Sequence, residues 1–131
     1  MRLLLDTHIA LWAILDFPRL PAHARELIED PDNQIVVSAA SIWEIAIKHA
    51  LAGGSPNDMS ISAREAVAYF RDAGFELLDI SVAHAAGVES LPALHGDPFD
   101  RMLVAQSLAT PLRLLTHDKT VAAYSDLVIA V

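Results

Sequence analysis

The stretch Leu3-Leu4-Leu5-Asp6-Thr7-His8 opens the chain and decides the fold. Three consecutive leucines are typical of a short strand that is buried on both faces of a parallel sheet. Asp6 and Thr7 come next, where an aspartate would be a favoured N-cap residue of a helix. The stretch therefore predicts a core strand that delivers a carboxylate to one edge of a sheet.

Strands and helices are predicted to alternate along the rest of the chain. Short apolar or β-branched runs indicate four further strands, at 35–37, 75–80, 113–115 and 127–129. The segments between them indicate helices, the clearest at 22–29, 38–51 and 63–73, with a long one from Asp97-Pro98 onward. This alternation predicts an α/β protein, a three-layer α/β/α fold with a central, mostly parallel sheet of about five strands. The glycine-rich stretch 53–58 is expected to be a loop inside a single domain that spans residues 1–131.

The composition narrows the class of protein. The 131 residues are 53% apolar and carry a net charge of -8. An apolar fraction this high fits a sheet buried on both faces, together with some surface that a partner covers. The acidic balance argues against a broad nucleic-acid-binding surface and favours a basic partner.

The sequence also gives an expected cell compartment. The chain contains no cysteine, which excludes a disulfide framework and thiolate chemistry. The leucines before Asp6 are too few for a signal-peptide core, and no apolar run approaches the roughly 18 residues of a membrane span. We therefore expect a cytoplasmic protein that is neither exported nor embedded in a membrane.

Several acidic residues follow predicted strands or begin predicted helices, and each has a simple structural explanation. Asp6 can be an N-cap, and residues 41–44 match a capping box in which a glutamate bonds back to a serine amide. Asp97 and Asp100 fit an N-cap and the third helical position around a proline. Asp118 fits the first turn of a helix. Taken one at a time, each acid is explained more simply by helix capping than by chemistry.

Taken together, the acids suggest a metal site. Asp6, Glu44 and Asp118 each follow a predicted strand closely, and a loop brings Asp100 to the same region. In an open parallel sheet such strand ends lie along one edge, where ligands bind. Carboxylates that converge there would repel one another unless a cation joins them, and Mg²⁺ or Mn²⁺ suits oxygen ligands. Such an ion could activate a water for in-line attack on phosphorus.

Four stretches resemble one known family in the right order and at the right spacing. They are residues 4–8, 38–45, 95–101 and 116–118. Each is weakly specific alone, but together they resemble the PIN domain, and most of all the VapC-type toxin ribonucleases of bacterial toxin–antitoxin modules. The resemblance implies about five parallel strands and cleavage of RNA that depends on Mg²⁺ or Mn²⁺. It also implies a homodimer and a cognate antitoxin protein, and it leaves a larger hetero-oligomer with that antitoxin open.

The resemblance assigns roles to individual residues. The acids that it implies as catalytic and metal-binding are Asp6, Glu44, Asp100 and Asp118. Thr116 would be a hydroxyl next to the site, and Thr7 would support it from beside Asp6. Asp97 is an additional acid that would support the site from outside or cap its helix.

Two basic side chains are candidate substrate contacts. Lys48 lies four residues after Glu44 on the same predicted helix, so it can form an i,i+4 ion pair or contact a phosphate. Arg101 follows Asp100 and could hold either an acid or a phosphate, since arginine suits bidentate recognition.

The aromatic and histidine residues favour ordinary roles. Trp12 and Trp43 sit at helical spacing among aliphatic residues, which predicts core packing rather than base stacking. The histidines match no zinc-binding spacing and have no cysteine beside them. His8 and His117 stand out only because they neighbour Asp6 and Asp118.

Three other functions remain as alternatives to the metal-dependent endoribonuclease. A receiver-type, Mg²⁺-binding signalling domain would need a phosphoacceptor aspartate after a middle strand, and neither Ser81 nor the stretch around Val128 offers the residues of that class. A phosphatase with a nucleophilic aspartate generally has a second aspartate two residues later, where this chain has His8. A non-catalytic binding module of the same fold would use its acids only to cap helices.

Overall fold

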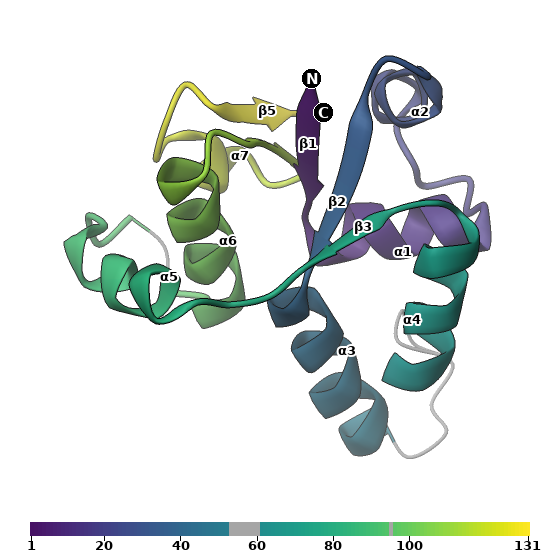
Figure 1. Ribbon diagram of the computed structural model, residues 1–131, viewed down its shortest axis with the longest axis horizontal. Coiled ribbons are helices and arrows are strands. Elements are labelled where there is room, and N and C mark those ends of the chain that lie inside the picture. Colours follow the sequence, from purple (N-terminus) through teal and green to yellow (C-terminus); the bar gives the residue numbers. More distant parts are fainter. Residues whose placement is uncertain (53–60, 95) are drawn as a thin grey trace.

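The computed structural model describes residues 1–52, 61–94 and 96–131, and Figure 1 shows how its elements are arranged. Five strands form one parallel sheet in the order β3-β2-β1-β4-β5. Their bounds are β1 Arg2–Leu5, β2 Gln34–Ser38, β3 Glu76–Leu78, β4 Arg113–Thr116 and β5 Val128–Ala130. The predicted three-layer α/β/α fold is confirmed. The loop expected at 53–58 lies outside the described residues.

Helices cover both faces of the sheet (Figure 1). Their bounds are α1 Thr7–Leu15, α2 Ala22–Glu29, α3 Ala39–Ala52, α4 Ala63–Asp72, α5 Val82–Gly87, α6 Pro98–Ala109 and α7 Lys119–Ala122, with a 3-10 turn η1 at Val88–Ser90. Residues of α1, α2 and α4 pack in one apolar cluster, and residues of α6 and α7 pack in a second cluster. Within the described ranges, every helix falls short of the length and apolar character that a membrane crossing requires.

The opening leucines explain why both faces are covered. Leu3 and Leu5 belong to the cluster under α1 and α4, whereas Leu4 belongs to the cluster under α6. This alternation follows from the two-residue period of a strand. Leu4 pairs with Val36 of β2 on one side and Leu114 of β4 on the other, and all three side chains are fully buried. The strand predicted from these leucines is therefore the centre of the sheet.

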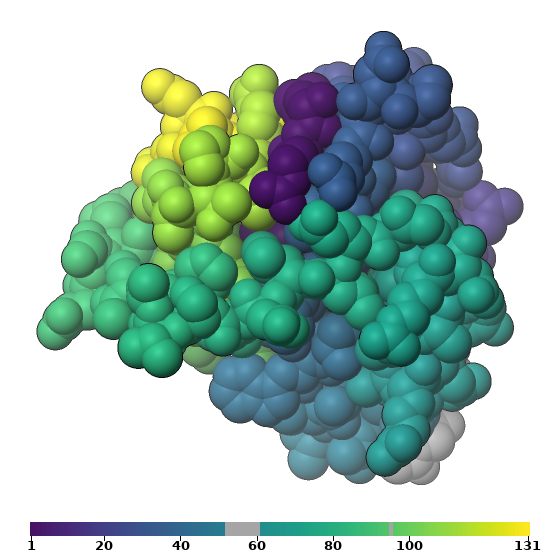
Figure 2. All heavy atoms as spheres, viewed as in Figure 1, coloured from purple at the N-terminus to yellow at the C-terminus, as the bar shows by residue number. Residues whose placement is uncertain are grey.

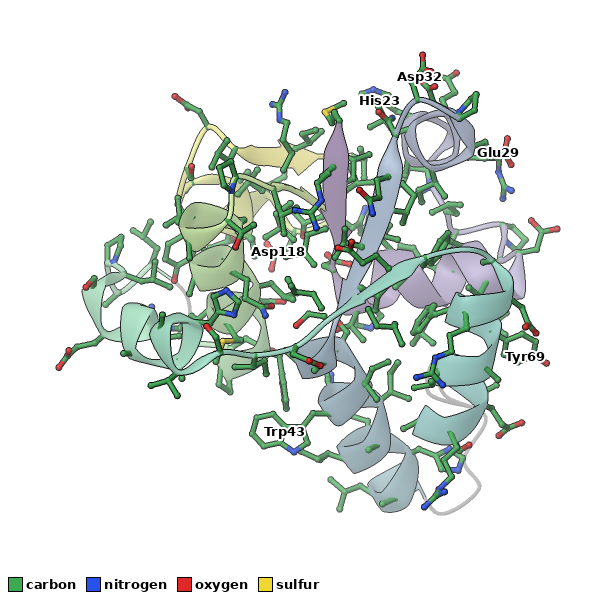
Figure 3. The ribbon with its side chains drawn as sticks, in the orientation of Figure 1. His23, Glu29, Asp32, Trp43, Tyr69 and Asp118 are labelled. Atoms are coloured by element: carbon green, nitrogen blue, oxygen red, sulfur yellow. The ribbon has the colours of Figure 1, made fainter. Side chains whose placement is uncertain are left out.

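One expectation about the core is wrong. Trp12 is buried as predicted, at 7% exposed, but Trp43 is 57% exposed. Helix α3 begins directly after β2, and the described residues leave its face with Trp43, Ile47 and Leu51 exposed. Figure 3 shows Trp43 projecting from α3 away from α4, and its ring meets Phe99 edge-on at a centroid distance of 5.1 Å.

Candidate active site

The order of the strands creates a crevice at the carboxyl ends of β1 and β4. From β1 the chain moves to β2 on one side, and after β3 it crosses to β4 on the other side. Ligands of open α/β sheets bind at such a point, where the strand order reverses. Asp6 directly follows β1, and Asp118 follows β4 after His117.

A cavity of about 550 Å³ lies at this crevice. Its lining residues are Asp6, His8, Trp12, Asp97, Asp100, His117, Asp118 and Lys119. Figure 3 shows Asp118 in the middle of the molecule, near the end of β1. Three of the four acids expected at the site, Asp6, Asp100 and Asp118, thus come together around one cavity, although Asp6 lies 94 and 112 positions before the other two.

Asp6 is buried and fixed by hydrogen bonds. Its Oδ1 accepts from the Ile9 amide at 2.9 Å, which confirms its predicted role as the N-cap of α1. Its Oδ2 accepts from the Thr116 hydroxyl at 2.6 Å and from the His117 amide at 3.3 Å. Burial nevertheless raises the pKa of the Asp6 carboxyl above its usual value, and these hydrogen bonds offset only part of that effect. The ionised form of Asp6 is therefore less favourable in the folded chain than in water.

The Thr116 hydroxyl connects two of the acids. It donates to Asp6 and accepts the amide hydrogen of Asp118 at 3.0 Å. Asp118 itself caps α7, because its Oδ1 accepts from the Thr120 amide at 2.8 Å. Thr116 is fully buried, so water does not replace these bonds. One hydroxyl thus sets the positions of two carboxylates.

Asp97 and Asp100 enter the cavity from the start of α6. Asp97 is the N-cap, and its Oδ1 accepts from the amides of Phe99 at 2.8 Å and Asp100 at 3.1 Å. Pro98 occupies the first helical position, where its missing N–H has no cost. The capping role predicted for Asp97 is confirmed, and it leaves Asp100 in the first turn at the cavity.

Glu44 is placed differently from the other acids. It is 4% exposed; its Oε1 accepts from the Thr7 hydroxyl at 2.6 Å and its Oε2 from Lys48 Nζ at 2.5 Å. The capping box expected with Ser41 is wrong, because α3 already begins at Ala39 and Ser41 lies inside it. The i,i+4 pair with Lys48 is confirmed. Glu44 is not among the described residues that line the cavity.

Arg101 faces the loop before α6. Its guanidinium donates to backbone carbonyls and to one phenol: Val88 O, Leu91 O, Pro92 O and Tyr124 Oη. These bonds tie the 88–92 segment to α6 and link α6 to Tyr124, which follows α7. Whether Arg101 also contacts a phosphate stays a prediction.

The residues around the cavity suit a hard divalent cation in their chemistry. Among the residues that the structure describes, no three Asp, Glu or His side chains are grouped closely enough to hold an ion by themselves. Mg²⁺ does not demand such a cage, since it keeps several waters and binds one or two carboxylates together with substrate phosphates. Oxygen donors on Asp6, Asp100 and Asp118 fit that mode, and a cation would offset the burial that raises the pKa of Asp6.

Four lining residues were not assigned to the site from the sequence. In the sequence, His8 and His117 stand out only as neighbours of acids, and the helical spacing of Trp12 predicts core packing. Lys119 has no distinguishing feature other than its position directly after Asp118. The spacing of His8 and Trp12, one helical turn apart, is the feature that could have shown that their rings meet.

Comparison with solved structures shows the fold. A VapBC2 complex from Rickettsia felis, bound to a DNA fragment from its promoter, matches with a TM-score of 0.70 at 18% identity, covering 98% of this chain and 96% of that one. A toxin–antitoxin complex from Klebsiella pneumoniae matches with a TM-score of 0.64 at 19% identity, over 97% of this chain and 95% of the other. FitAcB from Neisseria gonorrhoeae matches with a TM-score of 0.61 at 16% identity, over 98% and 96%.

Comparison with sequences gives the family. No curated protein matches the chain. The PIN domain profile matches residues 3–127, which include Leu3–Leu5 of β1 and the acids Asp6, Glu44, Asp100 and Asp118. The chain therefore belongs to the PIN domain family, whose members are nucleases.

Proposed function

We propose that the chain is a metal-dependent endoribonuclease that acts as the toxin of a toxin–antitoxin module. Its family consists of nucleases, and the structures that it resembles are described as toxin–antitoxin complexes. The observation that carries the proposal is the cavity at the β1–β4 crevice, where Asp6, Asp100 and Asp118 line one space.

Each residue of the cavity has a role in this proposal. Asp6, Asp100 and Asp118 would hold Mg²⁺ or Mn²⁺. Glu44 would complete the set of acids once its carboxylate releases the ammonium group of Lys48 and turns to the ion. When bound, the ion supplies Lewis-acid chemistry. It lowers the pKa of a water molecule, so that hydroxide is available to attack phosphorus at neutral pH, and it neutralises the charge on the leaving oxygen.

The neighbouring side chains hold the acids and the substrate. The Thr116 hydroxyl favours the ionised form of Asp6, because it donates to the charged carboxylate. Lys119 lies at the cavity and would contact a phosphate of the RNA, as would Lys48 once released from Glu44.

Cleavage of RNA tests the proposal directly. The purified chain is incubated with a single-stranded RNA oligonucleotide in Mg²⁺, in Mn²⁺ or in EDTA, and the products are separated on a denaturing gel. We expect internal cuts with either metal and none in EDTA. Intact RNA in all three, or equal cutting in EDTA, would contradict the proposal.

Thermal unfolding tests the metal site without reference to activity. Because the ion would bind only the folded chain, Mn²⁺ at 100 times its dissociation constant should add about 2.7 kcal/mol of stability. Asp32→Asn provides a control, since Asp32 lies on an exposed loop away from the cavity (Figure 3). The control should gain as much stability as the wild type, whereas an unchanged melting temperature for both would argue against a metal site.

We also propose a homodimer, formed through the outer face of α3. Trp43, Ile47 and Leu51 lie one helical turn apart and are 57%, 36% and 80% exposed. Beside them, a cavity of about 350 Å³ lined mainly by apolar residues of α3, α5 and α6 leaves room for a side chain of a second copy. Figure 2 shows α3 reaching the surface between α5 on one side and α4 on the other. An exposed apolar patch of this kind marks an interaction surface.

Light scattering after gel filtration tests the dimer. Trp43→Asp should give a monomer, since it places a charge in the apolar patch. Tyr69→Asp changes an aromatic residue that is 47% exposed on α4 and should leave the mass of the wild type unchanged. A wild type that is monomeric at micromolar concentration would remove this part of the proposal.

A cognate antitoxin completes the proposal. The net charge of -8 and the acids of the cavity favour a partner with a basic side chain, which could occupy the place of the cation. Expression of the chain in a bacterial host should stop growth, and co-expression of the neighbouring reading frame should restore it. Normal growth without the neighbouring frame would contradict the toxin assignment.

A further inference from the structure

Three aromatic rings form part of the wall of the cavity at the β1–β4 crevice. His8 and Trp12 come from α1, and His117 comes from the turn between β4 and α7. The Trp12 ring lies 5.8 Å from His8, tilted by 51°, and 5.5 Å from His117, edge-on at 72°. We call these three residues the imidazole–indole wall.

The buried indole supports two imidazoles that reach the cavity. Trp12 is 7% exposed, whereas His8 is half-buried and His117 is exposed. His117 Nδ1 lies 3.1 Å from the carbonyl oxygen of Val131, which fixes the orientation of its ring. The outer surface of the wall is therefore a pair of planar rings in defined positions.

Packing alone does not account for this choice of residues. Aliphatic side chains would cover the indole with no polar atoms to solvate. The Trp12 Nε1 donor is buried and makes no hydrogen bond within the described part of the chain, so the fold bears the cost of an unsatisfied polar group at this cavity. Buried unsatisfied groups of this kind are often retained at functional sites.

We propose that the imidazole–indole wall binds a nucleobase of single-stranded RNA by stacking, next to the phosphate that is cleaved. His8 lies two residues after Asp6 and His117 directly precedes Asp118, so a base stacked on the wall belongs to a nucleotide at the reacting phosphate. The cavity, at about 550 Å³, is in the size range of small-ligand pockets, which is enough for one nucleotide. This inference rests on the proposed ribonuclease function and names the form of RNA that the site accepts.

Stacking on the wall has two consequences. A base can stack on a side chain only when it is unpaired, so the site selects single strands and loops over duplexes. All four bases have a π face, so the wall itself selects little sequence. His117, the most exposed ring, is the platform, while Trp12 and His8 keep it in place.

Fluorescence and binding of a modified RNA test the wall. A single-stranded oligonucleotide with 2′-O-methyl and phosphorothioate groups is titrated in Mg²⁺, and a gel checks that it stays intact. In a Trp43→Phe background the only tryptophan is Trp12, so its fluorescence reports on the wall. We expect the single strand to quench this fluorescence and a duplex of the same sequence to bind at least about 10-fold more weakly.

Substitutions at His117 separate stacking from charge. His117→Ala should weaken binding by about 10-fold, in the range of one base–aromatic stack. His117→Phe should restore most of the affinity because it keeps a planar ring, whereas His117→Lys should not. His23→Ala, an exposed histidine on α2 far from the cavity, is the matched control and should bind as the wild type does (Figure 3).

The outcomes keep the two proposals apart. Equal RNA affinity of the His117→Ala variant and the wild type would contradict the stacking proposal. So would a His117→Lys variant that binds RNA more tightly than His117→Phe. The ribonuclease proposal would then still be judged by its own cleavage assay in Mg²⁺ and EDTA. Absence of any single-strand binding would likewise overturn the wall.

Discussion

Asp6→Asn should lower RNA cleavage by about 100-fold or more while the chain stays folded. Changes to residues that merely orient metal ligands already cost roughly 10- to 100-fold, so loss of a ligand charge should cost at least as much. Asp6 lies at the centre of the site, directly after the central strand β1, and lines the cavity. A time course of cleavage in Mn²⁺ measures the loss.

The same substitution should not unfold the protein. The amide oxygen of asparagine can still accept the Ile9 N–H bond that caps α1. Because burial raises the pKa of the Asp6 carboxyl, ionisation of this group is unfavourable in the folded state. Its contribution to stability is present below the pKa of the unfolded chain and is lost as the pH rises through the higher pKa of the folded state. Asparagine has no carboxyl group that ionises, so the stability of Asp6→Asn does not fall in this way as the pH rises.

Urea unfolding at several pH values, with and without metal, checks this difference in stability between the wild type and Asp6→Asn. In EDTA the difference in unfolding free energy should move in favour of Asp6→Asn as the pH rises. In Mn²⁺ the wild type should gain stability and Asp6→Asn should not, with Asp32→Asn behaving as the wild type. If Asp6→Asn cleaves RNA at the wild-type rate, or gains equal stability from Mn²⁺, then Asp6 is a helix cap only.

The central strand and part of the cavity could be predicted because they depend on local rules. Three leucines in a row are typical of a strand buried on both faces, and the alternation of strands and helices predicts a parallel sheet that is covered on both sides. Asp6 and Asp118 meet because each follows a strand and those two strands are neighbours. Asp100 follows no strand; it lies in the first turn of α6 and lines the same cavity.

The partners of Glu44 depend on how helices cross, and no local pattern encodes that. The Thr7 hydroxyl reaches Glu44 across 37 positions of the chain because α1 packs against α3. The residues from Ser41 to Glu44 match the capping-box pattern, but α3 already begins at Ala39, so Ser41 lies inside the helix and does not cap it. The helical spacing of Trp43 predicts core packing, yet α3 extends past the sheet and the described residues leave Trp43 exposed.

Thr116→Val should reduce cleavage by about 10- to 100-fold, although its side chain is not proposed to touch the metal or the RNA. Valine has nearly the same shape as threonine but lacks the hydroxyl. That hydroxyl donates to Asp6 Oδ2 at 2.6 Å and accepts the Asp118 amide at 3.0 Å, so both acids lose a fixed partner. Thr116 is fully buried, so water does not take the place of its hydroxyl, and the loss of these two bonds should also lower stability by roughly 1–3 kcal/mol.

The pH profile shows whether Thr116 acts through Asp6. The hydroxyl is the largest influence that lowers the pKa of Asp6 against the effect of burial, so its removal should raise that pKa further. If ionised Asp6 is needed for cleavage, the acidic limb of kcat/KM should then move to higher pH in Thr116→Val. Thr116→Ser keeps the hydroxyl and should restore both the rate and the pH profile. A loss of stability in Thr116→Val with an unmoved acidic limb would mean that the hydroxyl supports only the fold, and that Asp6 is not the group whose ionisation limits the reaction.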